Sequence, residues 1–152
     1  MKSRALGGHR AGHPGGGPLA LVLLLLAACA GSARREAGSL TDAVDQYRRA
    51  DSATRAAREA AVASVPCSVA RVCAAKDACL AAIGPTTRAL SLEDEVAARV
   101  HELETGALSK DSPDALALPG KLAEAQRLLV QGRDGMRACD AALGALRADL
   151  GT

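Results

Sequence analysis

Aromatic side chains are almost absent from this 152-residue chain, which has no Phe, no Trp and a single Tyr, Tyr47. Stacking platforms for sugars, bases or quaternary amines are therefore excluded as the basis of its function. The core must be built from Ala, Leu, Val, Ile and Cys, and each of these contributes less buried apolar area than an aromatic ring. A core this poor in large side chains gains stability from covalent cross-links.

The chain also lacks the short motifs of common catalytic and cofactor sites. It contains no G-x-S-x-G, no glycine-rich phosphate loop, no H-E-x-x-H and no C-x-x-C. His101 is the only histidine after residue 13, and Ala98 stands where a di-metal carboxylate bundle would have a glutamate. We therefore expect no enzyme activity, no cofactor, no metal site and no small-molecule substrate.

The chain does have a leader-like start. Lys2, Arg4 and Arg10 make it positively charged, and an apolar run over residues 19–28 ends in small residues. This order is typical of a secretory signal, so we expect residues 1–28 to be a signal peptide. The apolar run is about half as long as a membrane-spanning helix needs, which disfavours a retained transmembrane helix.

The sequence Leu26-Ala27-Ala28-Cys29 closes this run with a leucine, two small residues and a cysteine. It resembles the lipobox of bacterial lipoproteins, and the resemblance covers residues 1 to about 30 only. It implies cleavage before Cys29 and acylation of Cys29, which would anchor the chain to a membrane of the bacterial cell envelope. Ala30, in place of Asp, resembles the sorting pattern of lipoproteins of the outer membrane that face the periplasm.

Removal of residues 1–28 would leave 124 residues, enough for one domain. Since three basic residues leave with the leader, 16 basic residues face 17 acidic ones and the formal net charge changes from +2 to −1. A near-neutral chain does not support nucleic-acid binding. Residues 29–38 are predicted to be the lipidated cysteine and a flexible tether, and residues 39–152 a helical domain.

The chain after the tether is rich in helix-forming residues, and each expected helix ends at a proline or glycine. The first three expected helices cover residues 39–65, 68–83 and 86–105, and end at Pro66, Gly84-Pro85 and Gly106. The first is expected to carry a narrow, Ala-rich stripe made of Leu40, Ala43, Val44, Tyr47, Ala50, Ala57 and Ala61. The third helix has a run of acidic residues on its outer face, which is typical of a solvated surface.

Leu118-Pro119-Gly120 predicts the start of the last helix. Ten of its residues follow one another at alternating spacings of four and three: Leu118, Leu122, Ala125, Leu129, Gly132, Met136, Cys139, Leu143, Leu146 and Leu150. This heptad seam predicts packing against long antiparallel neighbours, and its unbroken phase favours one helix through Gly132 and Gly135. The sequence thus predicts an all-α bundle of three or four antiparallel helices with a coiled-coil-like last helix.

Four further cysteines in an exported chain predict two disulfides. Cys67, Cys73 and Cys79 are spaced six residues apart, which on one undisturbed helix leaves successive sulfurs ~120° apart around the axis and ~9 Å apart along it. Only one of them can therefore pair with Cys139, and the other two pair where the helix is broken, remain free or find a partner in another chain. Because Pro66 directly precedes Cys67, we prefer Cys67–Cys73 with Cys79–Cys139, and Cys73–Cys139 with Cys67–Cys79 stays open.

Three functions are compatible with this sequence. The first is a non-catalytic, lipid-anchored envelope protein that presents a helical surface to a protein partner or to a copy of itself. The second is a thiol–disulfide protein in which two of Cys67, Cys73 and Cys79 cycle between reduced and oxidised states, motivated by the difficulty of pairing all four. The third is a periplasmic chaperone or stress sensor, an analogy at the level of the fold alone.

Overall fold

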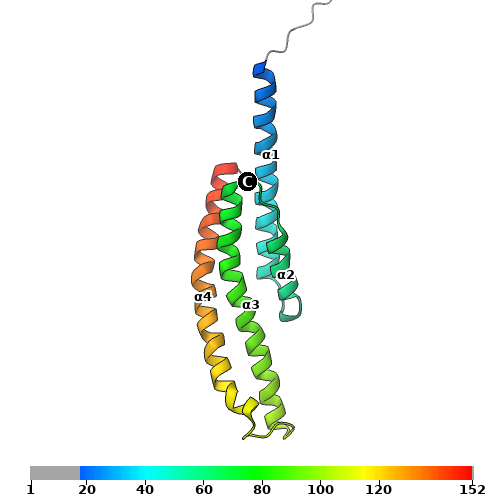
Figure 1. The fold of residues 1–152 in the computed structure, drawn as a ribbon, viewed down its shortest axis with the longest axis vertical. Coiled ribbons are helices and arrows are strands. Elements are labelled where there is room, and N and C mark those ends of the chain that lie inside the picture. The colour runs from blue at the N-terminus through cyan, green and yellow to red at the C-terminus, as the bar shows by residue number, and fades with distance from the viewer. Residues whose placement is uncertain (1–17, 152) are drawn as a thin grey trace, which may run out of the picture.

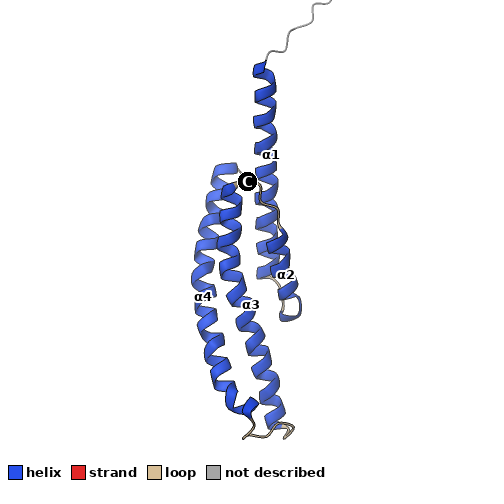
Figure 2. Cartoon of the chain, in the orientation of Figure 1, coloured by secondary structure: helices blue, strands red, loops and turns tan. Residues whose placement is uncertain are grey.

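The computed structural model describes the backbone of residues 18–151 and the side chains of residues 31–151. Within these residues the chain forms four α-helices and no strand: α1 Pro18–Arg48, α2 Ser52–Ser64, α3 Ala70–Glu104 and α4 Pro113–Leu150. Helices α3 and α4 form a long antiparallel hairpin, and α1 and α2 pack on one half of it (Figure 1, Figure 2). The predicted all-α architecture is confirmed.

The main core lies in the half of the hairpin that α1 and α2 cover. It includes Leu40, Val44 and Tyr47 of α1, Val62 of α2, Val72, Cys79 and Ile83 of α3, and Cys139, Leu143 and Leu146 of α4. The stripe predicted for α1 therefore faces this core. Small residues beside it, Ala33 and Ala37, are also buried, which lets α1 lie close to its neighbours.

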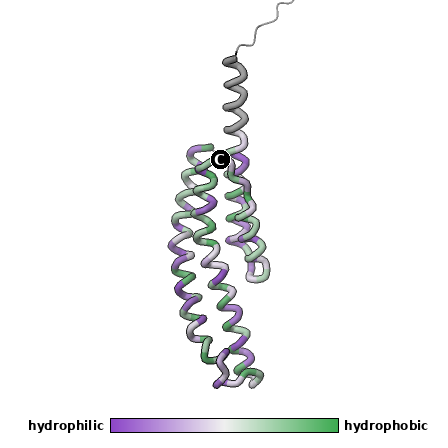
Figure 3. Tube along the Cα trace, in the orientation of Figure 1, coloured by the Kyte–Doolittle hydropathy of each residue, from purple (hydrophilic) through white to green (hydrophobic). Residues whose placement is uncertain are grey.

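A second, smaller core lies in the other half of the hairpin, which we call the distal hairpin and define as residues 88–104 and 113–131. Its buried residues are Ala89, Leu92, Ala125 and Leu128, all from α3 and α4. The turn between α1 and α2, residues 49–51, marks the end of the cover, and the hairpin continues well beyond it (Figure 1). The first residues of its α3 part, up to Asp94, still lie beside the start of α2. Apolar positions recur along both helices of the distal hairpin (Figure 3).

The segment predicted as a flexible tether is helical from residue 31 to residue 38. Ala33 and Ala37 are spaced one turn apart and buried, and Arg34 Nε donates a 2.7 Å hydrogen bond to the Leu150 carbonyl oxygen. Helix-forming residues with a buried face explain the difference. Residues 1–17 of the predicted signal peptide and the side chain of Cys29 lie outside the described residues, and residues 18–28 form the start of α1. The domain boundaries stay predictions.

The predicted helix over residues 39–65 is broken at residues 49–51, which we call the elbow. Asp51 is the N-cap of α2 and accepts a 2.9 Å hydrogen bond from the Thr54 N–H. This bond and one from the Thr54 hydroxyl lower the pKa of Asp51. A new helix can start at this point because the Asp51 side chain accepts a hydrogen bond from a backbone N–H that has no partner inside the helix. Helix propensity alone does not predict this start.

The predicted stop at Gly84-Pro85 is wrong, because the expected helices 68–83 and 86–105 form the single helix α3. Proline removes one backbone donor and crowds the preceding turn, so it usually ends or kinks a helix. Here the Thr86 hydroxyl donates a 2.9 Å hydrogen bond to the Ala82 carbonyl oxygen. Packing against the other helices holds α3 together through the proline.

Helix α4 begins at Pro113, earlier than the predicted start at Leu118-Pro119-Gly120. Ser112 is its N-cap and accepts a 3.1 Å hydrogen bond from the Ala115 N–H, and Pro113 occupies the first turn, where its missing donor costs nothing. Gly106, with φ of +77°, follows the end of α3 as expected.

From this start α4 runs as one helix, which confirms the prediction for Gly132 and Gly135. Seven of the predicted seam residues are buried: Leu118, Ala125, Gly132, Cys139, Leu143, Leu146 and Leu150. Leu122 is not, with 41% of its surface exposed, and Leu128 is buried in the distal core instead. The seam is wrong at Leu122 because only one helix, α3, lies beside α4 at that level.

Candidate functional site

The four cysteines form the two disulfides of the preferred set. Cys67–Cys73 has a Cα–Cα distance of 5.1 Å and Cys79–Cys139 one of 4.5 Å. The second is fully buried and joins α3 to α4, whereas the first is partly exposed. Cys67 precedes the start of α3, so it reaches Cys73 without breaking a helix. All four cysteines are therefore paired, so the difficulty of pairing them no longer motivates a thiol–disulfide function.

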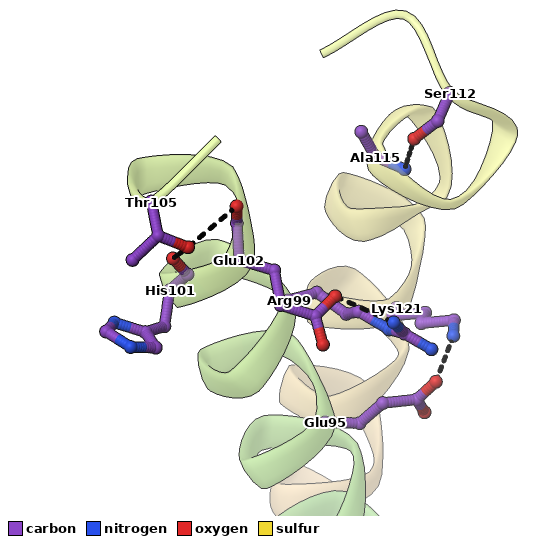
Figure 4. Close-up of polar contacts among 8 residues, drawn as sticks. All are labelled: Glu95, Arg99, His101, Glu102, Thr105, Ser112, Ala115 and Lys121. Carbon is purple, nitrogen blue, oxygen red and sulfur yellow. Dashed lines mark hydrogen bonds and ion pairs between the residues drawn. The ribbon is translucent and has the colours of Figure 1, made fainter. Parts of the chain in front are cut away.

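The position of His101 bears on the possibility of a metal site. His101 is exposed near the end of α3, and Figure 4 shows its ring directed away from α4. No group of three or more His, Cys, Asp or Glu side chains suited to a metal occurs in the part of the chain that the structure describes. Of the acids on this helix, Glu95 pairs with Lys121, and Glu102 with Arg99 at 2.7 Å (Figure 4).

A small cavity of about 140 Å³ lies between α2 and α3. Its polar lining is Ser52 and Arg55 from α2 and Thr87, Ser91 and Asp94 from α3. The Arg55 guanidinium donates a 2.8 Å hydrogen bond to the elbow backbone, and its Nε has no partner among the described residues. Charges of both signs therefore line the cavity.

The distal hairpin has two different edges. The Glu95–Lys121 ion pair bridges α3 and α4 along one edge and lowers the pKa of Glu95 (Figure 4). Val100 lies ~140° around α3 from Glu95, and Leu122 lies ~100° around α4 from Lys121. In an antiparallel pair these rotations bring Val100 and Leu122 to the same, opposite edge, where they are 40% and 41% exposed.

This second edge is bounded by two helical stripes, and we call the surface between them the distal groove. On α3 the stripe is Glu93, Ala97, Val100 and Glu104, spaced four, three and four residues apart. On α4 it is Ala115, Leu122 and Gln126 with the half-buried Leu129 beside them. The floor of the groove is apolar, and its α3 rim is acidic.

The distal groove continues the groove that α1 fills in the covered half of the hairpin. Leu122 precedes Asp140 by 18 residues, or five turns at ~3.6 residues each, so both lie on the same side of α4. Asp140 forms an ion pair with Arg48, near the end of α1. Helix α1 therefore lies on the side of the hairpin that carries Leu122, and it ends at the elbow before reaching it.

Reasoning from sequence missed this surface. The heptad spacing places Leu122 in the buried seam, and the acidic run of α3 predicts a single solvated face. The spacing of Glu93, Ala97, Val100 and Glu104 is a signal that could have found it, because small and apolar residues flanked by acids one turn away indicate an edge rather than a core.

Comparison with protein-family models, with curated proteins and with solved structures found no match to this chain. Within the residues searched, which are those the structure describes, no helix is long and apolar enough to cross a membrane. The two disulfides are typical of a domain that folds outside the reducing cytoplasm.

Proposed function

We propose that this chain is a non-catalytic, lipid-anchored protein of the bacterial cell envelope that presents the distal groove to a protein partner. The observation that carries the proposal is the unequal cover of the α3–α4 hairpin. Helices α1 and α2 pack on one half, and the other half exposes Val100 and Leu122 on the same edge. Apolar residues gathered on one helical edge favour protein contacts over contact with water.

The anchor is supported by the residues Leu26 to Cys29 and by disulfides that fit an oxidising compartment. Of the envelope membranes, Ala30 after the cysteine favours the outer one. The mass of the full chain extracted from membranes tests the anchor, with Cys29→Ser as the control. Acyl groups on the wild-type chain and none on the variant are expected, and an unacylated wild-type chain would contradict this part of the proposal.

The interaction surface is tested by photo-crosslinking in living cells. A photoreactive amino acid is placed at Gln126, on the groove, or at Leu116, which is 70% exposed on a different side of α4. We expect adducts from position 126 that are lost when Val100→Glu and Leu122→Glu are introduced together. Equal adducts from both positions, or none from position 126, would mean that the groove is not an interaction surface.

A further inference from the structure

We propose that the distal groove binds an amphipathic helix of a partner protein whose apolar stripe is flanked by lysine or arginine. This inference rests on the proposed function and specifies the chemistry of the partner. It is carried by three features of the chain: the helix that already fills the same groove, the distribution of charge on its rims, and the unfavourable contacts that a second copy would make.

We expect the bound segment of the partner to be a helix, because helix α1 packs on the same side of the α3–α4 hairpin in its covered half. In the covered half, α1 packs Leu40, Val44 and Tyr47, which follow at four- and three-residue spacing, against α3 and α4. The distal groove lies beyond the elbow on the same side of the hairpin. A partner helix placed there would continue the third layer that α1 begins, and would cover Val100 and Leu122.

The occupant is basic because the unpaired charge on the groove is acidic. Glu93 and Glu104 on the α3 rim form no ion pair with any residue that the structure describes. The basic side chains of the distal hairpin that form ion pairs do so with acids outside the groove stripes: Arg99 with Glu102, Lys121 with Glu95, and Arg127 with Glu124. The rim is thus left acidic, and cations on a bound helix would neutralise it.

Helix α1 supplies a precedent for this charge pattern as well. Its Arg48 pairs with Asp140 on α4, and its Arg34 Nε donates a 2.7 Å hydrogen bond to the carbonyl oxygen of Leu150 near the end of α4. The helix that fills the covered half of the groove is therefore amphipathic and places arginines at the groove rims. The distal groove repeats the arrangement, and no helix that the structure describes covers it.

The size of the groove sets the length of the partner. From Glu93 to Glu104 the α3 stripe rises by ~17 Å, which is about three helical turns. The floor consists of small and medium side chains, so the contact area falls at the low end of specific interfaces. We expect a reversible interaction that weakens as salt concentration rises.

A second copy of this chain fits the groove less well. If two copies faced each other in opposite directions, a two-fold axis would set α3 against α3 and bring the rims with Glu93 and Glu104 together, where like charges repel. If they pointed in the same direction, the α1 and α2 helices of both copies would occupy the same space between the hairpins. The observations therefore favour a partner of different sequence.

The test uses the full chain, extracted with its anchor, carrying the photoreactive amino acid at Gln126 or at Leu116. The probe is a labelled 18-residue helical peptide with leucines at i, i+4, i+7 and i+11 and lysines beside them. Its controls are the same peptide with glutamate for lysine, and a scrambled peptide of the same composition. We expect at least ten times more lysine-peptide adduct at position 126 than at position 116, and several-fold less in the double variant Glu93→Gln, Glu104→Gln.

Four results would overturn the inference. They are equal adducts from positions 126 and 116, equal adducts with the glutamate or scrambled peptide, an unchanged yield in the rim variant, or a chain–chain adduct of twice the mass at position 126. Because the crosslinking in living cells needs no peptide, adducts there combined with failure of the lysine peptide would leave the proposed function standing and remove only the basic helix.

Discussion

The Tyr47 hydroxyl donates a 3.2 Å hydrogen bond to the backbone carbonyl oxygen of Ile83, two residues before the proline inside α3. Since its one proton is used there, the Thr87 hydroxyl, at 3.0 Å, donates to the Tyr47 oxygen. The only tyrosine of the chain thus links α1 to the turn that Pro85 disturbs. The bond holds α1 against α3 beside the turn that contains Pro85.

Replacing Tyr47 by phenylalanine should therefore destabilise the fold by about 1 kcal/mol, because two hydrogen bonds are lost while the ring stays packed. Urea-induced unfolding, followed by circular dichroism, measures the change. The double variant Tyr47→Phe, Thr87→Val should cost less than the sum of the two single variants, since the residues share one hydrogen bond. Strict additivity would show that the two hydroxyls act independently.

A close approach of α3 and α4 at Gly132 gives a second prediction. A Cβ atom on Gly132 would lie 3.2 Å from the Ala82 carbonyl oxygen and closer still to the Thr86 hydroxyl, whereas one on Gly144 would meet nothing within 4 Å. We expect Gly132→Ala to destabilise the fold by about 1–3 kcal/mol through overpacking. Gly144→Ala, in the same helix, should stabilise it by about 0.5–1 kcal/mol. Thermal unfolding of both variants is the measurement.

Much of this fold follows from residue patterns, and the failures share one cause. The heptad seam of α4, the stripe of α1 and the preferred disulfides were predictable because each depends on spacing within a helix. The continuation of α3 through Pro85 and the exposure of Leu122 were not, since both depend on which helices lie alongside. At Pro85 neighbouring helices supply donors and packing, and at Leu122 the expected neighbour is absent. The distal groove is not predictable from spacing for the same reason as the exposure of Leu122, because both depend on which helices lie beside α4.

The two disulfides should differ in their contribution to stability. Cys79–Cys139 closes a sequence separation of 60 residues and Cys67–Cys73 one of 6. On the chain-entropy model, removal costs about 4 kcal/mol for the first and about 2 kcal/mol for the second. Replacing each cysteine pair by alanines and comparing the urea unfolding of the two variants tests which disulfide contributes more stability.

Because the Cys79–Cys139 sulfurs are fully buried, dithiothreitol should reduce Cys67–Cys73 first, as mass spectrometry after alkylation would show. Simultaneous reduction would contradict this.

Stability should fall in acid. Glu36 accepts hydrogen bonds from the Ser68 hydroxyl and the Ser68 N–H, at 2.5 and 2.8 Å, and these lower its pKa. A carboxyl whose pKa is lower in the folded state stabilises it fully above the ordinary value and loses that contribution as pH falls through the folded value. The melting temperature should therefore drop as pH falls below about 4. Glu36→Gln should flatten part of this dependence, and an unchanged profile would show that the contact contributes nothing.

The contrast between Leu122 and Leu118 tests the assignment of the distal groove directly. Both are leucines on the heptad seam of α4, one turn apart, but Leu118 is 7% exposed and Leu122 is 41% exposed. Leu118→Glu would bury a charge and remove core packing, at a cost of about 3 kcal/mol or more. Leu122→Glu would place its carboxylate in water at the groove and change stability by no more than about 0.5 kcal/mol. If urea unfolding gives equal, large losses for both, then the seam is buried as the heptad alone predicts, and the groove between Val100 and Leu122 is not open. If only Leu118→Glu unfolds the chain, Leu122 is free to contact a partner, and its substitution becomes a clean probe of binding without loss of fold.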